Sequence, residues 1–99
     1  MMRLARVMDE VGIFFSPHNP SGPVCHAVSL QVSAAVTRPH SLEVQFGETP
    51  VVGSLSDRGL QQVTSGEMVV SGSPGIGMGL CGKQLSACRS SQWTMSRAG

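Results

Sequence analysis

His18 is the side chain in this sequence whose type and setting best suit proton transfer. It lies in the proline-rich segment Ser16–Pro23 (SPHNPSGP), directly after a short apolar run. An imidazole titrates near neutral pH, although a histidine in such a segment is more often an ordinary turn residue. A catalytic role requires a carboxylate that sets the tautomer of the ring. Asp9 and Glu10 are too close in sequence, and on the wrong side of the apolar run, to supply it.

The glycine-rich segment Gly77–Gln84 (GMGLCGKQ) nearly matches the phosphate-binding loop pattern, with Lys83 at the position of the lysine. Gln84 replaces the hydroxyl residue that binds Mg²⁺ in that loop, and no long apolar strand leads into Gly77. Chance in a glycine-rich stretch explains the match better. A small nucleotide-binding module using Gly77–Lys83 stays open as an alternative.

The other candidate groups have ordinary explanations. Cys81 and Cys88 are seven positions apart, form no C-x-x-C motif and have no histidine nearby, so they predict no metal site. Apolar packing or a free thiol is the expected role of both. His26 and His40 have no setting comparable to that of His18.

Length and composition limit the possible functions. The chain has 99 residues and a net charge of +1 without a basic cluster, which does not suit binding to nucleic acid. No apolar run approaches the roughly 20 residues that cross a bilayer, and the amino terminus is not a secretory signal. Three cysteines leave one unpaired in any disulfide scheme, which predicts a reducing, cytoplasmic location. With only 4% aromatic residues, the chain is either a marginal small domain or part of something larger.

The first third of the chain predicts a helix, a strand and a second helix. Met1–Val11 has apolar residues at i, i+3, i+4 and i+7, which is typical of a helix, and Gly12 stands where a left-handed residue closes one. Ile13–Phe15 is a continuous apolar run typical of a strand buried on both faces. Ser16–Pro23 is expected to be an ordered loop, in which Ser21 can cap the next helix.

The second predicted helix spans Val24–Val36, and a second predicted strand follows at Ser41–Phe46. The apolar positions of the helix fall mostly on one face: Val24, Ala27, Val28, Val32, Ala35 and Val36. The strand alternates between apolar residues on one side and polar residues on the other. Its polar side faces solvent in an open sheet, or the axis in a barrel covered by helices, and the alternation does not distinguish these cases.

The later part of the chain carries weaker signals. Gly47–Gln62 is expected to be an irregular connection, Glu67–Val70 a short strand and Ser71–Gly82 a glycine-rich segment. Positions 83–99 are polar and serine-rich, with Trp93 as their large apolar side chain. This composition predicts a poorly ordered tail.

Three segments, in order, resemble the enolase superfamily: 11–50 (VGIFFSPHNPSGPVCHAVSLQVSAAVTRPHSLEVQFGETP), Glu67–Val70 and Ser73–Gly77 (SPGIG). More narrowly, they are similar to the mandelate racemase/muconate lactonizing enzyme branch, close to the acid-sugar dehydratases of the galactonate type. The resemblance covers about positions 2–80.

The resemblance implies an α/β fold, namely the C-terminal part of a modified (β/α)8 (TIM) barrel with a return segment to an α+β capping domain. Gly12–Phe15 would be barrel strand seven, and Ser41–Phe46 would be strand eight. Residues 1–46 would then form the last βα units of the barrel. Residues 47–82 would form the return segment toward the capping domain, and 83–99 the poorly ordered tail.

The resemblance also implies that His18 and Glu43 are catalytic and substrate-binding residues. His18 matches the strand-seven histidine that takes or gives the substrate α-proton, or acts as acid on the leaving hydroxyl. Glu43 matches the strand-eight carboxyl group that hydrogen-bonds the substrate carboxylate as it becomes an enediolate. To donate that bond Glu43 must be protonated, which burial favours.

Mg²⁺ is the implied cofactor, but no residue of this chain matches the three carboxylates that bind it on strands three, four and five. The base on strand two and the strand-six aspartate that partners the histidine also have no counterpart here. The resemblance therefore assigns no metal ligand to this sequence.

The implied function is that of a C-terminal fragment of a Mg²⁺-dependent acid-sugar (galactonate/gluconate-type) dehydratase, with racemization left open. Its substrate would be a small carboxylate, its full-length relatives homo-oligomers, and neither nucleic acid nor membrane a partner. The isolated chain is expected to be inactive. The alternative is a non-catalytic truncated gene product with no independent function.

Overall fold

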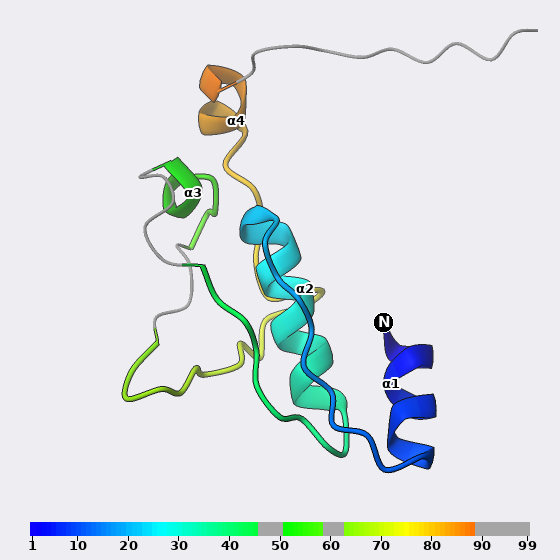
Figure 1. The fold of residues 1–99 in the computed structure, drawn as a ribbon. Coiled ribbons are helices and arrows are strands. Elements are labelled where there is room, and N and C mark those ends of the chain that lie inside the picture. Colours follow the sequence, from blue (N-terminus) through cyan, green and yellow to red (C-terminus); the bar gives the residue numbers. More distant parts are fainter. Residues whose placement is uncertain (46–50, 59–62, 89–99) are drawn as a thin grey trace, which may run out of the picture.

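The computed structural model describes residues 1–45, 51–58 and 63–88, and these contain four helices (Figure 1). They are α1 (Met2–Glu10), α2 (Gly22–Ala35), α3 (Val51–Ser54) and α4 (Gly82–Cys88). The longest helix, α2, lies at the centre. The extended segments that precede and follow it in the sequence both run alongside it (Figure 1). Within these residues, no helix is long and apolar enough to span a membrane.

The amino-terminal helix and its closing turn form as predicted. α1 ends next to Gly12, whose φ of 74° lies in the left-handed region that glycine adopts without strain. The Ile13 N–H donates to the Met8 carbonyl over 2.8 Å and closes the turn. The apolar face of α1 is nevertheless exposed at Leu4 and Val7, because the described residues contain no element that covers it.

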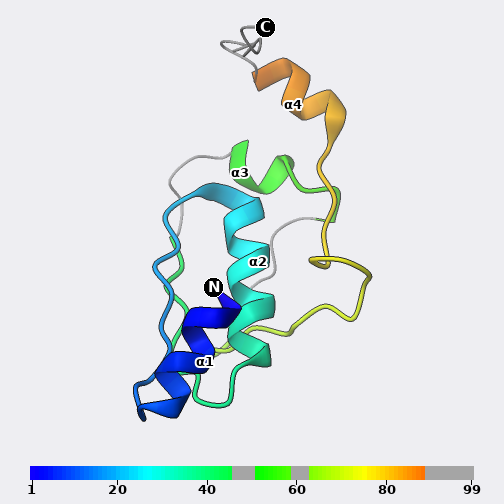
Figure 2. The same cartoon turned by 90° about the vertical axis from the view of Figure 1, so that its right-hand side faces the viewer.

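The segments before and after α2 meet, within the described residues, at a single parallel bridge between Phe15 and Pro39. Phe15 ends the first predicted strand, whereas Pro39 lies two residues before the second. The Phe15 N–H donates to the Arg38 carbonyl over 3.0 Å, and the His40 N–H donates to the Phe15 carbonyl over 2.9 Å. The segments before and after α2 therefore run in the same direction, as a strand–helix–strand connection requires (Figures 1 and 2). The prediction of full strands at Ile13–Phe15 and Ser41–Phe46 is wrong within the described residues, where no strand is formed.

Burial alternates along both extended segments. Phe15, Pro17 and Asn19 are buried, whereas Ser16 and His18 between them are exposed. The predicted loop therefore begins as extended chain with two distinct faces.

The second segment alternates as its sequence predicts. Leu42 and Val44 are half-buried, whereas Glu43 and Gln45 are exposed. Phe46, at the end of the predicted strand, lies outside the described residues. A cavity of about 350 Å³ lies beside the apolar side of this segment, lined by Leu30, Leu42, Val44, Val63, Gly66 and Met68.

The expected burial of Ile13–Phe15 on both faces is wrong. Phe15 is 5% exposed, but Ile13 and Phe14 are 54% and 58% exposed. Burial on both faces requires layers on both sides of a sheet, and within the described residues α2 supplies only one.

Helix α2 forms where it is predicted, but it buries a different set of residues. Its buried positions are Pro23, His26, Ala27, Ser29, Leu30 and Ser33, whereas the predicted Val24 is 42% exposed. Ser21 occupies the N-cap position, yet its hydroxyl makes no capping hydrogen bond. Small and polar side chains on the buried face let the neighbouring extended segment approach the helix closely, as the contact between Asn19 and His26 shows.

The later part of the chain departs most from expectation. The short helix α3 lies in the segment predicted to be irregular, and α4 occupies the first part of the predicted poorly ordered tail. The predicted strand Glu67–Val70 is not formed, since its one bridge joins Glu67 to Thr64 across a tight turn. Trp93 lies outside the described residues.

The contrast between Phe15 and Phe14 gives a test of the fold. Phe15→Ala empties a buried position and is expected to cost about 3–5 kcal/mol of unfolding free energy. Phe14→Ala removes an exposed ring whose one aromatic contact is with His40, at 5.8 Å between centroids, and is expected to cost about 1 kcal/mol. Urea unfolding followed by circular dichroism measures both, and equal losses would contradict the packing described here.

Candidate active site

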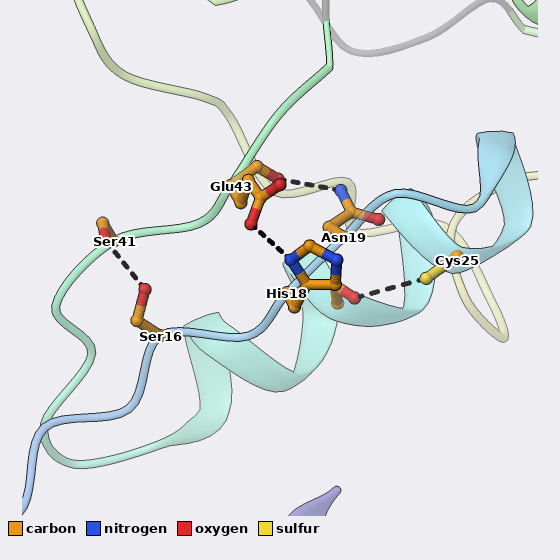
Figure 3. Close-up of polar contacts among 7 residues, drawn as sticks. Ser16, His18, Asn19, Cys25, Ser41 and Glu43 are labelled. Atoms are coloured by element: carbon orange, nitrogen blue, oxygen red, sulfur yellow. Dashed lines mark hydrogen bonds and ion pairs between the residues drawn. The ribbon is translucent and has the colours of Figure 1, made fainter.

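The two predicted site residues, His18 and Glu43, lie in contact (Figure 3). His18 Nδ1 is 2.8 Å from Glu43 Oε2, and the side chains are 75% and 46% exposed. Each comes from one of the two parallel extended segments and points to the face opposite α2 (Figure 3). The Glu43 side chain is half-exposed in the described chain, so the burial that would favour a protonated carboxyl group is not found there.

A second pair of side chains lies on the same face, two residues earlier on each segment. The Ser16 and Ser41 hydroxyls are 2.9 Å apart, and this pair has the same sequence separation, 25 residues, as His18 and Glu43 (Figure 3). The two pairs therefore report one register, with a repeat of two residues. Pro17 has no N–H to donate, so side chains hold the segments together beyond Phe15.

Asn19 ties the two segments together from the buried side. Its Nδ2 donates over 3.0 Å to the main-chain carbonyl of Glu43, and lies 3.0 Å from Nδ1 of His26 on α2. The sequence analysis treats His26 as an ordinary histidine and does not single out Asn19, which lies among turn-forming residues. The signal that could have identified His26 is its spacing. It lies three residues after Pro23 and four before Leu30, which places all three on the buried face of α2.

The contact with Asn19 fixes the tautomer of His26. An amide nitrogen only donates, so His26 Nδ1 accepts and the neutral ring carries its proton on Nε2. Burial lowers the pKa of the His26 imidazole from its ordinary value. Within the described residues, His26 Nε2 and Asn19 Oδ1 are buried without a hydrogen-bond partner.

The arrangement can hold His18 ready to accept a proton. A carboxylate at Nδ1 favours the tautomer with the proton on that nitrogen, which leaves the lone pair of Nε2 free. In the described residues, the carboxylate that meets His18 Nδ1 is therefore that of Glu43.

The described residues do not fit a magnesium site. Mg²⁺ takes oxygen ligands in octahedral geometry, whereas His18 and Glu43 offer one imidazole and one carboxylate. No group of three or more His, Cys, Asp or Glu side chains with metal-binding geometry occurs in the described ranges. Cys81 and Cys88 are free thiols.

In the glycine-rich segment Gly77–Gln84, the Asp57 carboxylate takes up one of the backbone N–H groups. The Gly79 N–H donates to Asp57 Oδ1 over 2.8 Å, and a Cβ on Gly79 would lie 2.7 Å from Asp57 Oδ2. The Asp57 carboxylate thus accepts the Gly79 N–H, whereas a phosphate-binding loop points such N–H groups at the bound phosphate. This geometry argues against the nucleotide-binding alternative at Gly77–Lys83.

Parallel extended segments joined through a helix are typical of the α/β class of proteins. The sequence model of the family described as "Enolase C-terminal domain-like" matches residues 1–84. The chain belongs to this family, which suggests the α/β enolase fold for it. No curated protein and no solved structure gave a significant match.

The lowered pKa of His26 predicts how stability varies with pH. The unfolded chain binds this proton more readily than the folded chain, so stability falls as the pH drops below the ordinary histidine value of about 6.5. Urea midpoints measured between about pH 7 and pH 5 should fall more steeply for the wild type than for His26→Asn. His40→Asn, at an exposed position, is the matched control and should follow the wild type. Equal slopes for the wild type and His26→Asn would contradict the neutral, buried His26.

The contact between Asp57 and Gly79 predicts that nucleotide does not stabilise the chain. MgATP should leave the thermal midpoint unchanged, because binding to the folded state alone would raise it. Differential scanning fluorimetry at millimolar MgATP measures this. A rise that disappears in Lys83→Ala would restore the nucleotide-binding hypothesis.

Proposed function

We propose that this chain is the C-terminal fragment of an acid-sugar dehydratase of the galactonate or gluconate type. The observation that carries the proposal is the 2.8 Å contact between His18 and Glu43, within a chain of the enolase C-terminal domain-like family. Dehydration of an aldonate requires the loss of a proton next to the carboxylate and the departure of a hydroxyl group. A single imidazole can serve either proton transfer.

His18 is the proton carrier in this proposal. With Nδ1 held by Glu43, Nε2 is the nitrogen that takes the substrate α-proton or protonates the leaving hydroxyl. Its exposed side chain is open to a small carboxylate on the face opposite α2. Transfer of a proton back to the other face of the same carbon would give racemization instead, and the contact alone serves both outcomes.

The proposal places the metal chemistry outside the described residues. Members of the enolase superfamily generally use Mg²⁺, which stabilises negative charge on the substrate carboxylate when bound. Because the described residues do not fit such a site, the isolated chain is inactive in this proposal. The parent enzyme is a homo-oligomer with a small-molecule partner only. We propose a cytoplasmic location, supported by the free thiols of Cys25, Cys81 and Cys88.

The first test uses the chain by itself. Purified protein is incubated with Mg²⁺ and a panel of aldonates, and 2-keto acid products are followed with semicarbazide. No turnover is expected, because the described residues hold no metal site that would stabilise the enediolate. Turnover by the isolated chain would overturn the proposal that it is a fragment.

The second test supplies the remainder of a barrel. Residues 1–84 replace the corresponding C-terminal segment of an active galactonate-type dehydratase, and the chimera is assayed with galactonate and Mg²⁺. The chimera should dehydrate galactonate, and His18→Asn should lower kcat by about 100-fold or more. His40→Asn is the matched control and should leave kcat within about two-fold, because surface substitutions away from a site have small effects.

A chimera with the native oligomeric size that gains no activity would count against the dehydratase assignment. An active chimera that tolerates His18→Asn would refute the role of His18. Activity toward the epimer of the substrate without loss of water would replace dehydration by racemization.

A further inference from the structure

Two hydrogen-bonding contacts and two covalent links form a closed circuit around the candidate site. His18 meets the Glu43 carboxylate, the main chain joins that side chain to the Glu43 carbonyl, and the carbonyl accepts from Asn19 (Figure 3). Asn19 directly follows His18 in the chain. A change in the position of Glu43 relative to His18 therefore has to break either the side-chain contact or the Asn19 bond.

Both hydrogens of the Asn19 side-chain amide have an acceptor. Its nitrogen carries two hydrogens, and the two acceptors within reach are the Glu43 carbonyl and His26 Nδ1, each at 3.0 Å. The residue is 4% exposed, so water does not compete for these hydrogens. A flipped amide would bring its oxygen against the Glu43 carbonyl oxygen, which cannot donate, so this carbonyl fixes the orientation of the amide.

His26 holds the Asn19 side chain against helix α2. It lies on the buried face of α2, one turn into the helix, and its ring is buried. Pro20 restricts the backbone of Asn19 to extended conformations, and Pro17 fixes the backbone just before His18. The parts of the site that stay exposed are then the side chains of His18 and Glu43.

We propose that Asn19, held by His26, is the positioning residue that sets Glu43 against His18. The proposal deepens the proposed function, since the histidine so oriented is the proton carrier assigned above. Asn19 acts through the main chain of Glu43 and through no contact with substrate. Without it, the Glu43 segment has no buried link to the His18 segment beyond the Phe15 bridge in the described residues.

The experiment reads the tautomer of His18 in the full 99-residue chain. Nitrogen NMR of the histidine rings separates the Nδ1–H and Nε2–H forms at a pH where the ring is neutral. In the wild type the Nδ1–H form should exceed its share in Glu43→Ala, because the Glu43 carboxylate accepts that proton. Asn19→Ala should lose more than half of this excess although Glu43 is still present. No substrate or metal is added, so the result is independent of the assays for dehydration.

Two substitutions of His26 separate positioning from general stability. His26→Asn keeps an acceptor at the same number of bonds from Cα as Nδ1, whereas His26→Leu removes it. The tautomer excess of His18 should survive in His26→Asn and fall in His26→Leu. Ser33→Ala is the matched control, because it also changes a buried polar residue of α2 but has no contact with Asn19, and it should keep the excess.

Each result decides the proposal. A folded Asn19→Ala chain that keeps the His18 tautomer of the wild type overturns it, and so do His26→Asn and His26→Leu chains with equal tautomers. If Asn19→Ala does not fold, the comparison between the two His26 variants decides instead. Loss of the excess in Ser33→Ala as well would show that any disturbance of α2 loosens the site, which also overturns it.

Discussion

The parallel course of the two segments 15–19 and 39–43 is the constraint on which the rest of the site depends. The backbone supplies it only at Phe15, whose two hydrogen bonds go to Arg38 and His40. Pro39 is tolerated between them because, in a parallel bridge, the groups of that residue point away from Phe15. Beyond this point Pro17 interrupts the ladder, and side chains take over: Ser16 with Ser41 on one face and Asn19 with the Glu43 carbonyl on the other. The proline that breaks the strand thereby leaves the face on which His18 meets Glu43 open.

This dependence explains the polar buried face of α2. A helix that only closed a core would bury its valines, yet Val24 is exposed while His26, Ser29 and Ser33 are buried. Small side chains on this face let the extended segment before α2 lie close to the helix. His26 supplies the nitrogen that accepts a hydrogen bond from Asn19. Burial lowers the pKa of the His26 imidazole because it disfavours the charged form of the ring, and burial of the neutral ring also costs free energy. The hydrogen bond to Asn19 offsets part of it, so helix and site stabilise each other.

The sequence predicted what depends on local rules. The span of α2, the left-handed Gly12 and the alternation through Glu43 and Gln45 follow from periodicity and backbone sterics, and each is found close to its expected place. The family followed from the order of several motifs. The exposure of Phe14 did not follow, because burial of an apolar run depends on neighbours that its own sequence does not encode. The Asn19–His26 contact was missed for a related reason: hydrophobic periodicity counts apolar residues and is blind to a buried polar pair.

Asn19 binds the main-chain carbonyl of Glu43 and not its carboxylate. This matters for two roles of the glutamate, contact with the substrate and contact with His18. The resemblance assigns its carboxyl group to the substrate, whereas in this chain the carboxylate meets His18 Nδ1. Asn19 holds the main-chain carbonyl and leaves the side-chain torsions free. If an aspartate from a preceding strand occupied His18 Nδ1, rotation about those torsions would release the Glu43 carboxyl toward a bound carboxylate without moving the backbone. The Asn19 bond to the Glu43 carbonyl is therefore compatible with both arrangements, and the group that faces the imidazole would decide between them.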